Sequence, residues 1–255
     1  MAGALPARWN RIVKIGLLAG SGRLPIILRE RVTFHHCLDL ATWPRPLGAV
    51  QAICQTMKQA GCEALCLAGA VDRQRFHDLD EGGAWVAQRA GPEAGDGQLL
   101  DALIAYFEQQ GFKIRGAGDV SPSLRTPAGV LTGALSFDPT SGLVRARTLG
   151  QQDVGQAVIH CGETLWLYED AAGTNTLIKR AGEIPAAVKT LFKAAKPQQD
   201  LRVDMPTWGP ETVRAAAQAG VRTLIFEAEK TLALDLDEAL DQARHQGLTI
   251  VGVAP

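Results

Sequence analysis

The feature that most constrains the fold is an apolar run over 12–19 that stops at Gly20. A short apolar segment bounded by glycine is typical of a buried strand that ends in a tight turn. Residues 24–31 then have the pattern of a short helix. A strand, a glycine turn and a helix in this order predict the start of an α/β domain.

The same alternation continues through the first half of the chain. Apolar residues recur at helical spacing, glycines stop them, and short apolar runs follow. The further elements expected are a helix over 47–60, a strand over 63–68, a helix over 99–107 and a strand over 112–117. Together they predict a Rossmann-like α/β domain over 1–125.

The stretch 118–150 differs, because prolines and glycines punctuate it, and it predicts a segment that crosses between two domains. A second α/β domain is predicted over 126–255. Its expected strands are 156–160 and 164–168, joined by a turn at Cys161 and Gly162, and then 200–204, 223–226 and 249–253. Its expected helices are 174–181, 185–193, 210–219 and a last helix that opens with a capping box of Asp235 and Glu238 and ends at Gly247.

Composition excludes several classes of protein. The 255 residues carry 26 basic and 27 acidic side chains, so a general surface for nucleic acid is not expected. No apolar run approaches the roughly 18 residues of a membrane-spanning helix, and 1–11 lacks the pattern of a secretory signal. Five cysteines are an odd count without paired spacing, which predicts reduced, buried thiols in a cytoplasmic protein.

The first candidate site is Gly20, Ser21 and Gly22, at the turn between the first strand and helix. Glycines let the backbone approach a phosphate or a ribose closely, and the amino end of a helix favours an anion. A dinucleotide-binding fingerprint needs a third glycine where Pro25 stands, so a nicotinamide or flavin site is disfavoured. A tight turn without a ligand explains the motif equally well.

The second candidate is Gly173, Thr174 and Asn175 ahead of an expected helix, with Arg180 further along the same helix. A helix start without a cap can receive an anionic ligand. Threonine and asparagine also cap helices with their own side chains, so simple capping is the alternative.

The third candidate is the segment 200–204. If it is extended, the two-residue period of a strand puts Asp200, Arg202 and Asp204 on one face. Carboxylates hold magnesium and arginine binds phosphate oxygens, so this row suits a magnesium ion bound to phosphate. The same row suits a surface ion-pair network, and both interpretations stay open. Pro206 would end the strand just after Asp204, at an edge where α/β sheets bind ligands.

These candidates belong to a series of blocks that spans nearly the whole chain: 16–25, 68–73, 95–100, 153–158, 173–175 and 196–209. The blocks are GLLAGSGRLP, AGAVDR, GDGQLL, DVGQAV, GTN and KPQQDLRVDMPTWG. In this order they resemble the UDP-2,3-diacylglucosamine pyrophosphatases of the LpxI type. Several ordered blocks are far more specific than any single glycine pair.

The resemblance implies a magnesium-dependent hydrolase of lipid A biosynthesis. Such an enzyme cleaves the pyrophosphate of UDP-2,3-diacylglucosamine to UMP and lipid X, which is 2,3-diacylglucosamine 1-phosphate. Water is expected to attack the phosphorus attached to the sugar, with the substrate between the two domains. Members of the family are cytosolic and associate peripherally with the inner membrane, and a homodimer is compatible with the resemblance.

The resemblance also implies roles for individual residues. Asp204 matches the aspartate of the family's Arg-x-Asp-x-Pro motif, on which hydrolysis depends, either as a metal ligand or as the group that orients water. The expected magnesium ligands are Asp204 and Asp200. The expected substrate-binding residues are Gly20, Ser21, Gly22, Gly173, Thr174, Asn175, Arg180, Lys196, Gln199 and Arg202.

The sequence departs from the family's pattern at several places. Ala172 and Asn175 stand where acidic residues are usual, Gly97 replaces a further aspartate, and 31–48 is shorter than the segment that usually fits another strand and loop. These departures leave an alternative open: a catalytically impaired relative that binds a nucleotide sugar or an acylated sugar phosphate without turnover. A nicotinamide-dependent oxidoreductase is a third hypothesis, which Pro25 disfavours.

Overall fold

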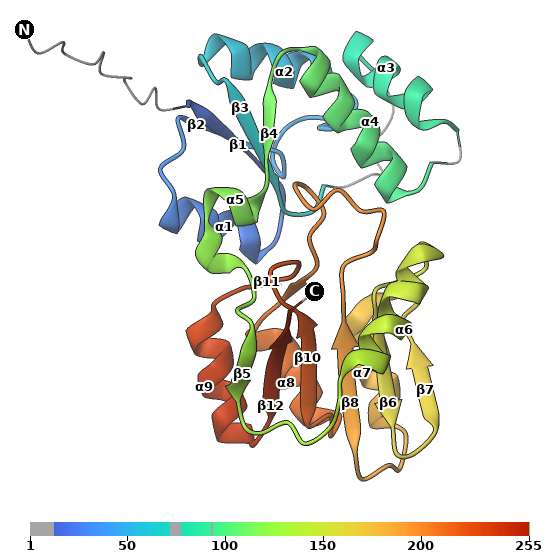
Figure 1. The fold of residues 1–255 in the computed structure, drawn as a ribbon. Coiled ribbons are helices and arrows are strands. Elements are labelled where there is room, and N and C mark those ends of the chain that lie inside the picture. Colours follow the sequence, from blue (N-terminus) through green and yellow to red (C-terminus); the bar gives the residue numbers. More distant parts are fainter. Residues whose placement is uncertain (1–12, 72–77, 93, 255) are drawn as a thin grey trace, which may run out of the picture.

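The computed structural model describes residues 13–71, 78–92 and 94–254, and it forms two α/β domains, one above the other in Figure 1. The predicted fold class is therefore confirmed, while the exact boundary after residue 125 stays a prediction. The leader 1–11 and the last two residues of the block 68–73 lie outside the described residues. Within the described ranges, no helix combines the length and apolarity that crossing a membrane requires.

The N-terminal domain is a parallel sheet with the strand order β2-β1-β3-β4. Its strands are β1 (Ile15–Ala19), β2 (His36–Asp39), β3 (Ala64–Ala68) and β4 (Lys113–Arg115). Its helices are α1 (Arg23–Arg31), α2 (Val50–Gln59), α3 (Glu81–Ala90), α4 (Asp96–Gln109) and α5 (Ala117–Val120). Leu17 of β1 packs in a cluster with α1 and α5, whereas Leu18 packs in a cluster with α2 and α4. Because helices cover both faces, the central strands β1 and β3 are apolar throughout, whereas the edge strands β2 and β4 carry polar residues.

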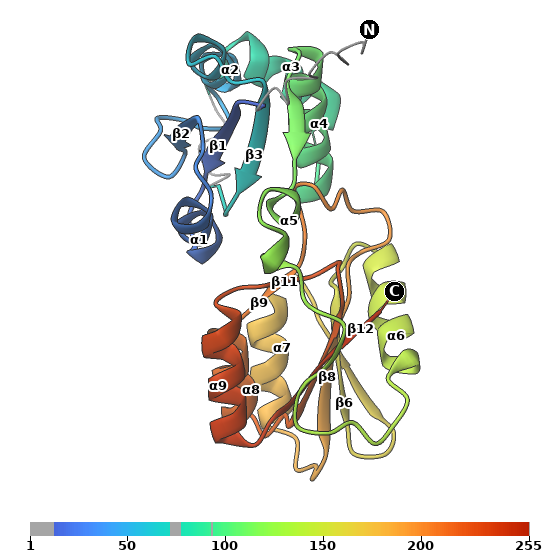
Figure 2. The same cartoon turned by 60° about the vertical axis from the view of Figure 1, so that its left-hand side comes forward.

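The C-terminal domain has a six-stranded sheet with the order β5-β12-β10-β8-β6-β7, and α7, α8 and α9 lie on the opposite face from α6 (Figure 2). Its strands are β5 (Gly129–Thr132), β6 (Ala157–Cys161), β7 (Leu165–Tyr168), β8 (Lys189–Lys193), β10 (Thr223–Glu227) and β12 (Thr249–Val253). Its helices are α6 (Thr140–Gln151), α7 (Gly173–Gly182), α8 (Pro210–Gln218) and α9 (Leu236–Gln246). Strands β8, β10 and β12 are parallel, and β5, β6 and β7 run antiparallel to their neighbours. A short parallel pair of β9 (Thr207–Trp208) and β11 (Leu232–Ala233) lies beside this sheet.

The segment 118–150 is more regular than predicted. After the end of α5 it contains a 3₁₀ turn (Pro122–Leu124), the edge strand β5 and the helix α6. Helix α6 buries Leu143, Ala146 and Leu149 against the second sheet. Only the part between the 3₁₀ turn and β5 therefore acts as the crossing between domains, and α6 belongs to the second core.

Two predicted elements are wrong. The segment 185–193 was expected to be a helix, but it contains the strand β8, all of whose residues are buried. The segment 200–204 was expected to be a strand, but it forms turns in which the Asp200 carbonyl accepts from the amides of Val203 and Asp204. Asp200, Arg202 and Asp204 therefore do not form a row on one strand face.

The predicted capping box at the start of α9 is also wrong. Asp235 has φ 47° and makes no side-chain capping bond; its carboxylate instead binds Arg23 of α1. The shortened segment 31–48 still forms a strand, β2, which pairs in parallel with β1. Four of the five cysteines are buried as expected, whereas Cys37 on β2 is exposed; none of the five forms a disulfide.

Besides the bond from Arg125 to the Glu229 carbonyl, three sets of contacts between described residues join the two domains. Leu232 and Leu234, around β11, pack with Met205 against the cluster formed by β1, α1 and α5. The second set is the ion pair of Arg23 with Asp235. The third is carried by the loop 194–206, orange in Figure 1, which rises from the end of β8 to the N-terminal domain. This loop contains Asp204.

The turn after β1 packs closely against the turn after β3, and this contact between backbones requires glycine at positions 20 and 69. The Gly20 amide donates to the Ala68 carbonyl, and the amide of Ser21 and the amide of Ala70 exchange bonds with each other's carbonyls. A Cβ atom on Gly20 would lie 2.4 Å from the Ala70 carbonyl oxygen, and one on Gly69 would lie 2.5 Å from that of Ser21. The close approach of these two turns requires Gly20 and Gly69, while the predicted contact of Gly20, Ser21 and Gly22 with a phosphate or ribose stays a prediction.

We expect Gly20→Ala to lower the free energy of unfolding by about 1–3 kcal/mol, because the added methyl group has to displace the backbone of the adjoining turn. Urea denaturation would measure the loss. Gly97→Ala is the matched control: it lies in α4, and a Cβ atom there meets nothing within 4 Å. The control is expected to keep or raise stability, by up to about 1 kcal/mol. Equal stability of Gly20→Ala and the unchanged chain would contradict the packing argument.

Candidate functional site

A polar cavity of about 530 Å³ lies where the amino ends of α7, α8 and α9 meet. Gly173, Thr174 and Asn175, predicted from the sequence, line it. Residues that sequence reasoning did not single out also line it, among them Arg23, Lys193 and Arg214. The second candidate of the sequence analysis is therefore part of a larger site. We call this site the polar cavity.

The amino ends at the polar cavity are well suited to an anion. The positions preceding α7, α8 and α9 are Ala172, Gly209 and Asp235, and none of them makes a side-chain capping bond. The first amides of a helix have no partner inside the helix, and the helix dipole adds partial positive charge at that end. The simple-capping alternative for Thr174 and Asn175 is therefore not what the structure contains.

Lys193 is a buried cation at the floor of the polar cavity. Its side chain is at the end of β8, and the residue is only 7% exposed. The ammonium donates to Thr174 Oγ1 at 3.1 Å and to the Thr207 carbonyl at 2.9 Å. The Thr174 hydroxyl in turn donates to the buried Glu169 carboxylate at 2.6 Å. Burial lowers the pKa of Lys193, and the negative charge of Glu169 opposes that shift.

Lys193 escaped the sequence analysis because its segment was predicted to be a helix. The signal that was available is a lysine at the end of an otherwise apolar run, in LFKAA. A buried lysine is rare unless it is paired, so such a residue indicates a polar partner or ligand once the run is recognised as a strand.

The ion pair of Arg23 and Asp235 stands at the rim of the polar cavity. Arg23 Nε and a second guanidinium nitrogen donate to the two carboxylate oxygens at 2.7 and 2.9 Å. This pairing lowers the pKa of Asp235. Since the arginine follows the Gly20 turn and the aspartate precedes α9, the pair links the two domains at this rim.

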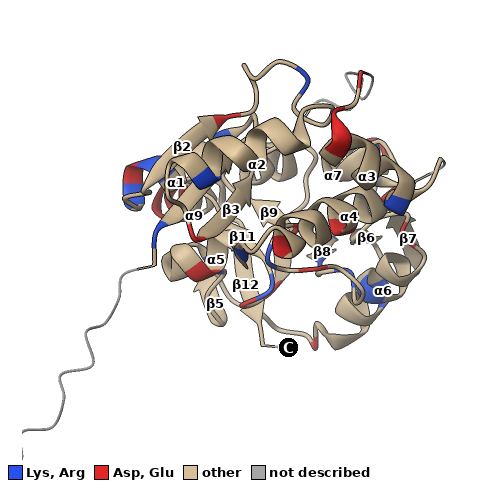
Figure 3. Cartoon of the chain, turned by 90° about the horizontal axis from the view of Figure 1, so that it is seen from above, with Lys and Arg blue, Asp and Glu red and all other residues tan. Residues whose placement is uncertain are grey.

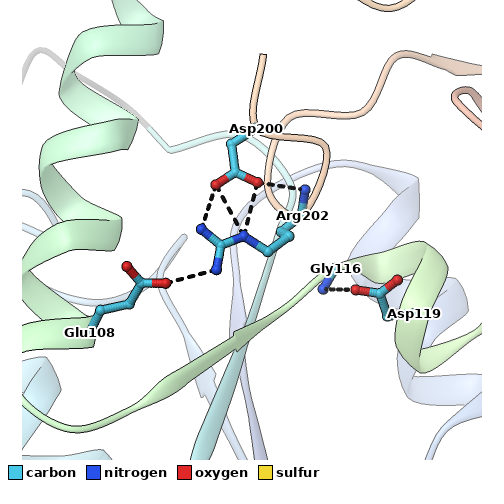
Figure 4. A network of polar contacts seen from close by, with 5 residues as sticks. All are labelled: Glu108, Gly116, Asp119, Asp200 and Arg202. Atoms are coloured by element: carbon cyan, nitrogen blue, oxygen red, sulfur yellow. Dashed lines mark hydrogen bonds and ion pairs between the residues drawn. The ribbon is translucent and has the colours of Figure 1, made fainter. Parts of the chain in front are cut away.

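Asp200 and Arg202 lie in the loop after β8 and form a network with α4 of the other domain (Figure 4). The Arg202 guanidinium donates three bonds of 2.6–3.1 Å to the Asp200 carboxylate and one of 2.7 Å to Glu108. Hydrogen bonds from Arg202 lower the pKa of Asp200. The structure thus contains the ion-pair alternative of the sequence analysis, with both Asp200 oxygens occupied.

Asp204 lies four residues beyond Asp200, with its side chain at a second cavity. This cavity of about 370 Å³ opens at the carboxyl ends of β1 and β3 and is lined mainly by apolar side chains. Leu18, Leu67, Leu103 and Phe107 are among them. Within the described residues, no hydrogen bond or ion pair engages the half-buried Asp204 carboxylate. We call this second site the apolar cavity.

The remaining predicted residues line neither cavity. Lys196 pairs with Asp153 at 2.6 Å, and Arg180 pairs with Asp170 at 2.9 Å. The side-chain nitrogen of Gln199 is buried without a partner in the part of the chain that the structure describes. Gly20, Ser21 and Gly22 form the turn against Gly69 and Ala70, and both of those line the apolar cavity.

The described residues fit a magnesium ion only with help from a ligand. They contain no group of three or more His, Cys, Asp or Glu side chains that could hold a metal by themselves. The open carboxylate of Asp204 offers one ligand. Magnesium is commonly held by one or two carboxylates together with phosphate oxygens and water, so Asp204 and a bound phosphate would suffice.

Charges of both signs are interspersed over the chain seen from above in Figure 3. This agrees with the balanced composition. The cations that matter for an anionic ligand are therefore those gathered at one place, the wall of the polar cavity.

Comparison with known proteins places the chain in a family. The model of the LpxI N-terminal domain matches residues 35–124, and that of the LpxI C-terminal domain matches residues 132–251. A curated relative from Caulobacter vibrioides, "UDP-2,3-diacylglucosamine pyrophosphatase LpxI", is 31% identical over 280 aligned positions. The alignment covers 95% of this chain and 98% of the relative, and it lends no support to the impaired alternative. This chain belongs to the LpxI family.

Proposed function

We propose that this chain hydrolyses the pyrophosphate bond of UDP-2,3-diacylglucosamine, with magnesium, to UMP and lipid X. The name of the Caulobacter relative supports the activity and the substrate. The observation on which the proposal mainly rests is that the Asp204 loop lies between two cavities of opposite character. Asp204 lines the apolar cavity, and Thr207, three residues later, lines the polar one.

The two cavities suit the two ends of this substrate. Its acyl chains gain free energy by leaving water for apolar surface such as that of Leu103 and Phe107. Its phosphates are anions, which helix amino ends and nearby cations favour. A substrate that extends from one cavity to the other brings its pyrophosphate to the intervening loop, beside Asp204.

Asp204 then has a defined task. Its carboxylate accepts a hydrogen bond from the attacking water, or holds the metal beside it, while the polar cavity holds the nucleotide phosphate. Magnesium would neutralise charge on the phosphate oxygens when bound. The water oxygen bonds to the phosphorus attached to the sugar, the bond from that phosphorus to the bridging oxygen breaks, and UMP leaves.

Further expectations remain proposals. They are peripheral attachment to the inner membrane, a cytoplasmic location, a homodimer, and substrate contacts from Arg180, Lys196, Gln199 and the Gly20 turn. A role for Asp200 as a magnesium ligand would require its carboxylate to leave Arg202. We therefore propose Asp204 as the protein's principal metal ligand.

The purified chain is expected to release UMP from UDP-2,3-diacylglucosamine in the presence of magnesium. Excess EDTA should stop the release, and added magnesium should restore it. In water labelled with ¹⁸O, the label should enter lipid X, because water attacks the phosphorus attached to the sugar. Absence of UMP under these conditions would contradict the proposed function, and label in UMP would contradict the direction of attack.

Asp204→Asn is expected to lower kcat by about 10²–10⁴-fold, because the amide keeps the shape but neither binds magnesium well nor accepts a proton. Steady-state assays would measure the loss, and circular dichroism would verify folding. Asp241→Asn is the control, since Asp241 is an exposed carboxylate on α9 that pairs with Arg244. Retention of full activity by Asp204→Asn would refute the assignment.

Glu108→Gln tests whether the loop needs its anchor on α4. Weakening the bond from Arg202 to Glu108 should lower kcat/KM by about 2–5-fold, since Asp204 is two residues from Arg202. The free energy of unfolding should change by less than about 1 kcal/mol, because both side chains are partly exposed. Asp241→Asn again provides a matched control, as it removes an ion pair of similar length inside one helix. Equal kcat/KM values for both variants would contradict the anchoring role.

A further inference from the structure

The buried ammonium of Lys193 has a donor to spare. A lysine ammonium carries three N–H groups, and two of them go to Thr174 Oγ1 and the Thr207 carbonyl. Within the described residues the third has no acceptor, and Lys193 lines the polar cavity. A buried donor without an acceptor is costly, so this arrangement calls for a ligand or water in the cavity.

The surroundings of Lys193 favour an anion as that ligand. The uncapped amino ends of α7 and α8 face the same cavity. Arg214, in the second turn of α8, also lines it, and its guanidinium has no ion-pair or hydrogen-bond partner in the described chain. Two cations and two helix amino ends therefore meet at one place.

Acidic residues on the same wall do not cancel this charge. Asp235 is neutralised by its bidentate pair with Arg23. Glu211 and Glu238 are exposed side chains in the first turns of α8 and α9. Charges facing water are screened, whereas Lys193 and its buried counter-charge Glu169 act through a medium of lower dielectric constant. Both Glu169 oxygens already accept bonds, from the Gln156 amide and the Thr174 hydroxyl, so the remaining donor of Lys193 is left for the cavity.

The position of Lys193 is fixed before any ligand arrives. Glu169 is buried, and it accepts bonds from the Gln156 amide and the Thr174 hydroxyl, each at 2.6 Å. The same hydroxyl accepts from Lys193. This chain of contacts fixes the ammonium and the start of α7 together, so little reorganisation accompanies binding.

We propose that Lys193 and Arg214 bind a phosphate group of the nucleotide in the polar cavity, with Lys193 donating its third hydrogen bond to a phosphate oxygen. The ligand class is a nucleoside phosphate, which here rests on the proposed function, where UMP is a product. Thr174 and Glu169 are positioning residues, because they act through Lys193. In this scheme Thr174 serves the site through its side chain by fixing the lysine.

The experiment is calorimetric titration of the full chain with UMP, which needs no turnover. Lys193→Met should weaken UMP binding about 10-fold or more, because a charge-assisted hydrogen bond in a buried site is lost. Arg214→Gln, at an exposed position, should weaken it several-fold without affecting folding. Lys193→Arg should bind UMP more tightly than Lys193→Met, because it restores the charge.

Lys189→Met is the matched control. Lys189 is the other buried lysine of β8, at the opposite end of the strand, where it donates to the Ala219 carbonyl. Removing it tests the general effect of losing a buried lysine, and UMP affinity should stay at that of the unchanged chain. Thermal melts of each variant would verify folding, and Arg214→Gln keeps the test valid if Lys193→Met fails to fold.

Two results would overturn the inference: no UMP binding by the unchanged chain, or unchanged affinity in both Lys193→Met and Arg214→Gln. Failure of the proposed function is a separate outcome. UMP binding that depends on Lys193, in a chain that releases no UMP from UDP-2,3-diacylglucosamine, would support the phosphate site and contradict the hydrolase. Hydrolysis of the substrate together with unchanged UMP affinity in both variants would support the hydrolase and contradict the phosphate site.

Discussion

The placement of Asp204 depends on the ion pairs that the Arg202 guanidinium forms with Asp200 and Glu108. The guanidinium binds Asp200 within its own loop and Glu108 on α4, so one planar group fixes the shape of the loop and its position on the other domain. Arginine suits this task because its fork of donors can serve two carboxylates at once. Asp200 and Arg202 thereby act as an anchor, which leaves Asp204 as the open carboxylate of the loop.

The contacts of Lys193 complement that anchor on the other side of the loop. Burying an ammonium costs free energy unless hydrogen bonds and a counter-charge offset it, and here Thr174, Thr207 and Glu169 supply both. Because Thr207 follows Asp204 by three residues, the same stretch of chain contacts both cavities. The amphipathic character proposed for the substrate is thus matched by a single connected stretch of the protein.

Sequence patterns correctly predicted helices with one apolar face and apolar strands that end at a glycine. Helix α2 and strands β1 and β3 follow such patterns and are present. Strand β8 was mistaken for a helix because no glycine flanks it and the lysines at its two ends interrupt the apolar run, so it lacks the glycine-bounded pattern that marks β1 and β3. The segment 200–204 alternates apolar and charged residues as a strand does, yet Arg202 closes it into a turn through Asp200 and a distant Glu108. Sequence spacing cannot reveal a contact across 94 residues. The same limit hid Arg23 and Arg214, which reach the site only through the arrangement of α1, α8 and α9.

The departures at Ala172 and Asn175 acquire a physical meaning from this geometry. The first turn of α7 carries no acidic side chain, so its amino end meets a phosphate without the repulsion that carboxylates there would add. Fewer carboxylates at this end also weaken any metal site built on it. In the proposed reaction that loss falls on the polar cavity, whereas Asp204 comes from a different segment and lines the other cavity. In that proposal the charge at the start of α7 can change without removing the carboxylate of Asp204.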